Sequence, residues 1–154
     1  MQIGFSLLEV GSVQPKSTKS VLIKNFFDFC LSSISWTLIG HAVAFGSSST
    51  KGIMGGNNNY ILFNSEKASA IEYANWLFSW AFVSTACTIV SGAVAERINF
   101  RAYFVFAVLL CILIYPVIAH MAWSNDGFMS PYREEDLFLG CGVIDFAGSG
   151  TCDI

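Results

Sequence analysis

Three aromatic side chains, Phe78, Phe82 and Trp123, have the types and spacing that could bind a cation. A helix places Phe78 and Phe82 on one face, because they are four residues apart, and Trp123 closes a later apolar stretch. The faces of aromatic rings attract cations by about 0.5–2 kcal/mol per contact, depending on how far water is excluded. The same residues would also suit an interfacial aromatic belt with phenylalanines facing lipid, so the spacing alone leaves both interpretations open.

Metal and redox chemistry have less support in the sequence. The two histidines, His41 and His120, show no spacing that is typical of metal or haem ligands. Three of the five cysteines lie within apolar stretches, where cysteine behaves as a small hydrophobic residue. Cys141 and Cys152 lie outside those stretches, and a disulfide between them is left open. A membrane enzyme or redox protein is thus a third hypothesis without a ligand motif, and we expect no enzyme activity, metal or cofactor.

Three long uncharged stretches must position these residues: 29–50, 73–95 and 102–125. A helix rises about 1.5 Å per residue, so about 20 mostly apolar residues cross a hydrocarbon core about 30 Å thick. Charged residues make up 12% of the chain, whereas soluble domains carry about 25%. Composition and spans together indicate an integral membrane protein.

The expected fold is all-α, a polytopic bundle of membrane helices forming a single partial transmembrane domain over residues 1–154. We expect helices at about 1–12, 21–46, 70–95, 101–123 and 142–154. The first and last are too short to cross a bilayer, and half-spans leave helix ends unpaired in lipid, so we expect a fragment of a longer protein.

One face of the third helix favours packing against a neighbour. Small residues recur there at steps of four and three: Ala81, Thr85, Thr88, Gly92 and Ala95. Such a stripe lets helix backbones approach closely in lipid. A many-helix bundle explains it better than an isolated anchor does.

Charges in the connectors predict the orientation. Connectors 11–24 and 96–101 carry a basic excess, so we expect both in the cytoplasm. The other two connectors, 47–69 and the acidic 124–141, would then be extracellular. This topology places all three aromatic residues near the extracellular surface, where the acidic connector would concentrate cations.

Charged residues near the cytoplasmic ends have less defined roles. Asp28 is a functional candidate because it is ionisable within a membrane segment, but it could equally pair with Lys24 one turn away. Glu9 lies near the cytoplasmic exit of the first segment, and the sequence assigns it no role. The net charge of -3 and the lack of a basic cluster argue against a nucleic-acid partner.

Several strings of this chain resemble the ammonium transporter family (Amt, Mep and the Rhesus-like relatives). They are MQIGFSLLEVGSV (1–13), KNFFDFC (24–30), WAFVSTACTIVSGAVAER (80–97), AHMAWSNDGF (119–128) and GVIDFAGSG (142–150). Their order and spacing also match, and the resemblance covers essentially the whole chain. It implies a fold of about eleven membrane helices, of which this chain would supply the end of the first to the start of the fifth.

The resemblance also implies roles for particular residues. Phe82 resembles the aromatic residue that closes the outer mouth of the pore, and Phe78 and Trp123 resemble the other rings of the ammonium recruitment site. Asp145 resembles the acidic residue that orders this vestibule. Its position before Phe-Ala-Gly-Ser suits an N-cap, although direct contact with the cation is an alternative.

The resemblance fails at Asp153. Family members normally have there the first of two pore histidines, eight residues after the equivalent of Asp145. Residues 151–154 (TCDI) depart from the pattern, and we expect that the chain left its proper reading near residue 150. A true aspartate substitution is the alternative.

The resemblance implies transport of ammonium or ammonia across the plasma membrane by a multi-pass protein in the lipid bilayer. A full-length protein of this kind would be a homotrimer. Because the histidine pair is not supplied here, we expect these residues alone not to conduct. The alternative is a truncated, non-transporting subunit that modulates a full-length transporter.

Overall fold

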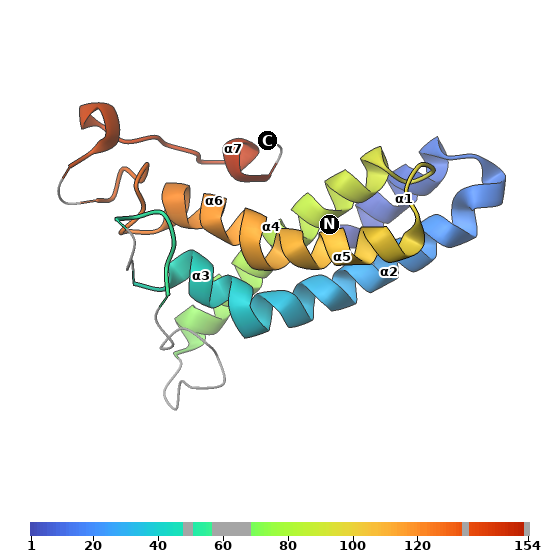
Figure 1. Cartoon of the computed structure of the whole chain (residues 1–154), viewed down its shortest axis with the longest axis horizontal. Coiled ribbons are helices and arrows are strands. Elements are labelled where there is room, and N and C mark those ends of the chain that lie inside the picture. Colours follow the sequence, from blue (N-terminus) through green and yellow to red (C-terminus); the bar gives the residue numbers. More distant parts are fainter. Residues whose placement is uncertain (48–50, 57–68, 134–135, 153–154) are drawn as a thin grey trace.

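The computed structural model describes residues 1–47, 51–56, 69–133 and 136–152. Three helical stretches within them are long and apolar enough to cross a membrane: Pro15–Phe45, Ala70–Ala93 and Phe100–Trp123. These stretches lie side by side along the long axis of the molecule (Figure 1). The described chain is therefore a bundle of membrane-spanning helices, as the sequence predicts.

Two of the three spans are interrupted by a π-helical turn. The first comprises the short 3-10 turn η1 (Pro15–Ser17), α2 (Thr18–Ser35), the π-helical η2 (Trp36–Gly40) and α3 (His41–Phe45). The second is a single helix, α4 (Ala70–Ala93), and the third comprises α5 (Phe100–Leu109), the π-helical η5 (Leu110–Ile114) and α6 (Tyr115–Trp123). Shorter elements are α1 (Gln2–Ser12), the 3-10 turn η6 (Phe138–Gly140) and α7 (Ser149–Cys152).

The first span starts earlier than the predicted boundary near residue 21. Pro15 opens the helical turn η1, and α2 follows directly from Thr18. Proline suits a first helical turn because its φ is already helical and its missing N–H is not needed there. As a result Lys24, which we counted with the connector 11–24, lies within α2 and is buried.

The last helix starts later than predicted. Helix was expected from about residue 142, but α7 begins at Ser149. Gly142 and Gly148 both have positive φ, which breaks helical geometry. The segment that precedes α7 is therefore an extended connection across the end of the bundle.

The connectors meet in two groups at opposite ends of the bundle. At one end the Gln14 amide donates to Glu96 Oε1 over 3.1 Å, which joins the segment after α1 to the segment after α4. At the other end the Phe128 amide donates to the Gly52 carbonyl over 2.8 Å, which joins the loop after α3 to the loop after α6. Successive helices that cross a membrane in alternating directions require their connectors to meet in these two pairs.

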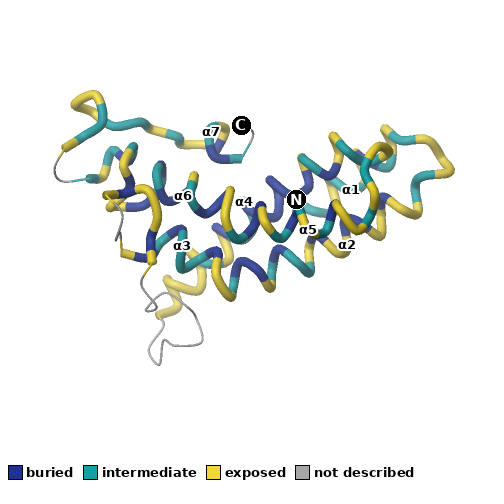
Figure 2. The backbone as a smooth tube through the Cα atoms, viewed as in Figure 1, coloured by how far each residue is buried: buried dark blue, intermediate teal, exposed yellow. Residues whose placement is uncertain are grey.

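The buried core lies where η2, α4 and η5 meet, and Figure 2 shows buried residues along the facing sides of the helices. Its members are Trp36, Ala44, Val83, Ala86, Cys87, Leu110, Cys111, Tyr115 and Ala119. The stripe of small residues on α4 packs against α1. Thr88 Oγ1 donates to Gln2 Oε1 over 2.7 Å, and a side chain on Gly92 would lie beside Glu9.

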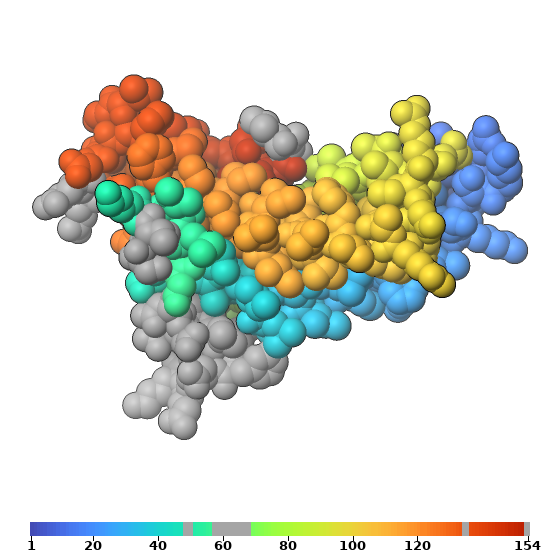
Figure 3. All heavy atoms as spheres, viewed as in Figure 1, coloured from blue at the N-terminus to red at the C-terminus, as the bar shows by residue number. Residues whose placement is uncertain are grey.

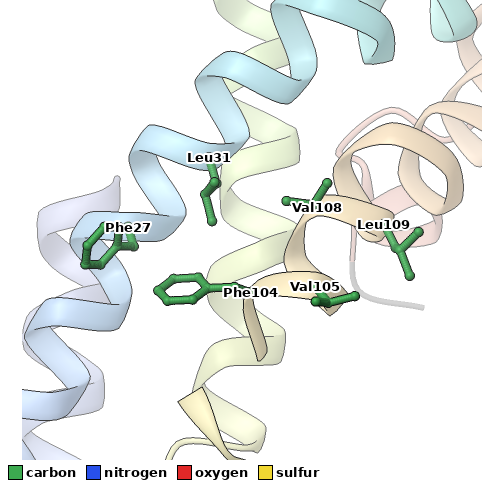
Figure 4. A pocket seen from close by; sticks show the side chains of 6 residues that line it. All are labelled: Phe27, Leu31, Phe104, Val105, Val108 and Leu109. Carbon is green, nitrogen blue, oxygen red and sulfur yellow. The ribbon is translucent and has the colours of Figure 1, made fainter. Parts of the chain in front are cut away.

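The outer surface is largely apolar. In Figure 3 the third span lies against the first along the visible face. An apolar groove of about 520 Å³ runs between α2 and α5 (Figure 4). It is lined by Phe27, Leu31, Phe104, Val105, Val108 and Leu109. A wall of this kind suits contact with hydrocarbon rather than water.

Candidate functional site

The three aromatic residues singled out from the sequence meet at one end of the bundle. The ring centroids of Phe78 and Phe82 are 4.9 Å apart, with the rings tilted by 53°. The Phe82 ring meets Trp123 edge-on, with centroids 5.2 Å apart and planes at 80°. Phe78 is 59% exposed, whereas Phe82 and Trp123 are half-buried. The cluster therefore runs from an exposed ring into the bundle, and we call these three residues the aromatic vestibule.

Two helix ends position these rings. Helix α4 starts with a capping box, in which the Ser69 amide donates to Glu72 Oε2 over 2.7 Å and the Glu72 amide donates to Ser69 Oγ over 3.3 Å. This box fixes the first turn and hence the face on which Phe78 and Phe82 lie. Helix α6 ends at Trp123, where the next amide still bonds back into the helix. The rings thus come from the first half and middle of α4 and from the last residue of α6.

Asp145 links the vestibule to α7. Its backbone carbonyl accepts a hydrogen bond from Trp123 Nε1 over 3.0 Å. Its carboxylate accepts from the amides of Gly150, at 3.2 Å, and Thr151, at 3.0 Å. These are the contacts of a carboxylate capping the first turn of a helix. Asp145 therefore holds the Trp123 ring and the start of α7 in a fixed relation, while direct contact with a cation stays a prediction.

Gly148 is a residue that the sequence interpretation missed. It has φ +80°, and a side chain there would lie 3.0 Å from the Phe82 ring and 3.3 Å from the Trp123 ring. Glycine lets the backbone pass directly over the two rings in a conformation that other residues rarely adopt. The string DFAGS could have pointed to this glycine, because it follows the capping aspartate closely. Only the packing shows that the glycine lies against the two rings.

Acidic residues lie in the connector beside the vestibule. Asp126 and Asp136 belong to the loop after α6, which also meets the loop after α3. Glu134 and Glu135 of the same connector lie outside the described residues, as does Asp153, the position of the expected pore histidine. Negative charge near an aromatic site raises the local concentration of cations.

The histidines have local partners within the bundle. His120 is fully buried, and its Nδ1–H donates to the Ala44 carbonyl over 2.8 Å. The His41 ring lies 5.8 Å from Trp36 and 5.4 Å from Phe45, measured between centroids. Among the residues that the structure describes, no group of three or more His, Cys, Asp or Glu side chains is arranged to hold a metal ion.

The disulfide left open by the sequence does not form. Cys141 and Cys152 are not bonded to each other in the described chain. The closest thiols are instead Cys87 and Cys111 in the core, whose Sγ atoms are 3.2 Å apart and unbridged. Both are nearly inaccessible and pack as small apolar residues.

A bundle of apolar helices long enough to span a membrane, with three aromatic rings meeting beside a capping aspartate, defines a polytopic helical membrane protein. The chain belongs to the Ammonium Transporter Family, whose sequence model matches residues 1–154. It is 36% identical over 154 residues to "Ammonium transporter 3" of Dictyostelium discoideum, covering 100% of this chain and 32% of that one. It is 41% identical over 151 residues to "Ammonium transporter 1 member 3" of Solanum lycopersicum, covering 98% and 32%.

The fold is also similar to a solved structure. The "Sensor Amt Protein" superposes with a TM-score of 0.79 at 31% identity, covering 98% of this chain and 36% of that one. The chain thus spans about a third of the length of the relatives it matches. The family and fold expected from the sequence are confirmed.

Proposed function

We propose that this chain provides the outer ammonium-recruiting part of an ammonium transporter. The observation that carries the proposal is the convergence of Phe78, Phe82 and Trp123, with Trp123 held by Asp145. An exposed ring leads to two half-buried rings, so a cation that enters loses water gradually as it gains ring contacts. The names of the relatives agree with ammonium as the cation.

The proposed mechanism follows from the cost of burying charge. A bare ammonium ion in hydrocarbon costs tens of kcal/mol in the idealised limit, so it cannot cross as such. The vestibule would hold the ion at the membrane surface, where ring faces and acidic side chains replace part of its hydration. Deprotonation and passage of neutral ammonia through an apolar pore would follow, as the family resemblance implies. In this chain Phe82, beneath Gly148, would be the last ring before the interior.

The proposal includes location and assembly. We place the protein in the plasma membrane, with connectors 11–24 and 96–101 in the cytoplasm. The connectors 47–69 and 124–141 then face outside, beside the vestibule. The hydrogen bonds that join the connectors in these two pairs support this arrangement. A full-length protein of this kind would assemble as a homotrimer.

Substitutions in the vestibule test the proposal. We expect Trp123→Ala to weaken ammonium binding by about 10-fold and Phe78→Ala by about 3-fold, because each removes a ring face from the cation. The measurement is calorimetric titration of the purified chain in lipid nanodiscs with ammonium chloride. Phe26→Ala is the matched control, since Phe26 is 66% exposed but lies on α2, which carries none of the vestibule residues. Equal affinities in all three variants would refute the proposal.

This chain covers only about a third of the length of its relatives, which leads us to expect that it does not transport ammonium by itself. We expect that these 154 residues, reconstituted alone in liposomes, give no ammonium flux above empty vesicles. Flux above that background would contradict this.

A modulatory subunit is a second candidate function, favoured by the apolar outward face of α1, where Ile3, Leu7 and Leu8 are exposed. Such a face could contact a full-length copy. Co-expression with an intact transporter tests this candidate, and unchanged uptake would rule it out.

A further inference from the structure

A second group of polar residues is buried at the opposite end of the bundle from the aromatic vestibule. We call it the buried polar cluster, and its members are Glu9 on α1, Lys24, Asn25 and Asp28 on α2, Ser91 on α4 and Tyr103 on α5. Burying several ionisable groups between four membrane helices is costly, and such groups mark functional sites by default. The transport mechanism proposed above uses none of them.

Hydrogen bonds connect the cluster across the helices. Asn25 Nδ2 donates to Glu9 Oε2 over 2.9 Å, which joins α2 to α1. Tyr103 OH donates to Asp28 Oδ2 over 2.5 Å, which joins α5 to α2. Asp28 is therefore held by Tyr103 rather than by Lys24, the partner that the sequence suggested.

The only lysine of the cluster is engaged elsewhere. Lys24 Nζ donates to the Ala95 carbonyl at the end of α4 over 3.0 Å, and it lies 5.4 Å from the centre of the Tyr103 ring. Its charge is thus directed at a helix C-terminus and a ring face, both of which attract cations. Neither carboxylate takes Lys24 as its direct partner.

Three oxygens in the cluster make no hydrogen bond within the protein: Glu9 Oε1, Asn25 Oδ1 and Asp28 Oδ1. Their residues are only 8%, 6% and 1% exposed, respectively. Asn25 and Asp28 are three residues apart and therefore share one face of α2. Asn25 also donates a hydrogen bond to Glu9, so the three oxygens lie in the same region of the bundle. The buried Ser91 hydroxyl also lacks a hydrogen bond. The Ser91 hydroxyl can donate to only one of these oxygens, and the carbonyl and carboxylate oxygens can only accept, so what the site lacks above all is positive charge.

Charge decides what would satisfy these oxygens. Two carboxylates and one ammonium group leave the cluster one positive charge short. A buried unpaired charge costs several kcal/mol, so it must be neutralised. One added proton, shared between two of the three oxygens, would satisfy those two and leave the third to the Ser91 hydroxyl, so a proton is the competing occupant of the site. A water molecule would supply donors but no charge. A small monovalent cation supplies the missing charge and can contact several oxygens at once.

We propose that the buried polar cluster binds one small monovalent cation, with Glu9 Oε1, Asn25 Oδ1 and Asp28 Oδ1 as its direct contacts. The chemistry is shared by ammonium and potassium, which are similar in size. The site is separate from the aromatic vestibule, and it takes its charge from carboxylates rather than from ring faces. Bound there, the cation ties α1 to α2 and stabilises the end of the bundle nearest the cytoplasm.

The test is cation-dependent stability of the purified 154-residue chain in detergent at fixed pH and ionic strength. We expect potassium and ammonium chlorides, at ten times the dissociation constant, to raise the unfolding midpoint by about 4 °C over choline chloride. Equal shifts from both cations identify an inorganic ion as a sufficient ligand, and a shift from ammonium alone identifies the transported ion. Equal midpoints in all three salts would overturn the proposal.

Variants locate the effect. Glu9→Gln and Asp28→Asn should abolish the shift, whereas Glu96→Gln, the same change at an exposed glutamate of the same end, should retain it. The double variant Phe78→Ala/Trp123→Ala should retain the shift in potassium chloride, and loss of that shift would assign it to the vestibule and refute the cluster. Failure of the vestibule proposal leaves this result unaffected. If Glu9→Gln does not fold, thallium(I) NMR line broadening by the wild-type chain, competed by potassium, decides the question.

Discussion

Replacing Gly40 with alanine should lower the free energy of unfolding by about 2–3 kcal/mol. Gly40 ends the π-helical η2 where it packs against η5. A Cβ atom there would lie 2.6 Å from Trp36 Cε3 and 2.8 Å from the Cys111 carbonyl oxygen. The carbonyl is backbone, so the two spans must move apart to relieve the contact. Helix propensity alone would favour alanine by about 1 kcal/mol, so packing must outweigh it. Unfolding in mixed micelles, followed by circular dichroism, measures the difference.

The matched control is Gly4→Ala, the same substitution within α1. Nothing lies within 4 Å of a Cβ atom at Gly4, so the change should be neutral or stabilise by up to about 1 kcal/mol. If Gly40→Ala proved as stable as Gly4→Ala, the close crossing of η2 and η5 would not exist as described.

His120→Ala should destabilise the bundle by about 3 kcal/mol. The ring is fully buried, and its Nδ1–H donates to the Ala44 carbonyl over 2.8 Å, so the change leaves both a cavity and a weakened link between α6 and α3. The free energy of unfolding in the same assay measures the loss. A histidine held in this way stabilises the helix packing.

His120→Asn separates the two contributions. The asparagine amide can present an N–H close to the position of Nδ1, so this variant should lose about half as much stability as His120→Ala. A His120→Ala variant with wild-type stability would contradict the structural role. Equal losses in the two variants would show that volume alone, not the hydrogen bond, stabilises this contact.

The vestibule shows how far local spacing can predict a site. Four-residue spacing put Phe78 and Phe82 on one face, and the alternation of charged connectors put Trp123 at the same end of the bundle. The structure brings all three together, so the convergence is observed, while ammonium recruitment stays a proposal. Gly148 escaped prediction because its role depends on two rings from other helices.

The end of the bundle that holds Lys24 and Asp28 shows where local spacing misleads. Lys24 and Asp28 are one turn apart, which suggested an ion pair, but Asp28 bonds Tyr103 and Lys24 bonds the end of α4. These partners lie far along the sequence, so no short-range pattern contains them. The early start of α2 is different, because Pro15 is a local signal that was read as part of the connector.

The sequence by itself determined the membrane spans, their alternation and the family. These properties follow from hydropathy, connector charge and short strings, each of which acts over a few neighbouring residues. Only the tertiary structure decided the partners of buried polar groups, the close crossing of η2 and η5, and the extended path before α7. The physical reason is that in lipid the helices are positioned by packing and by hydrogen bonds between distant segments, and both depend on shapes that exist only once the bundle has assembled.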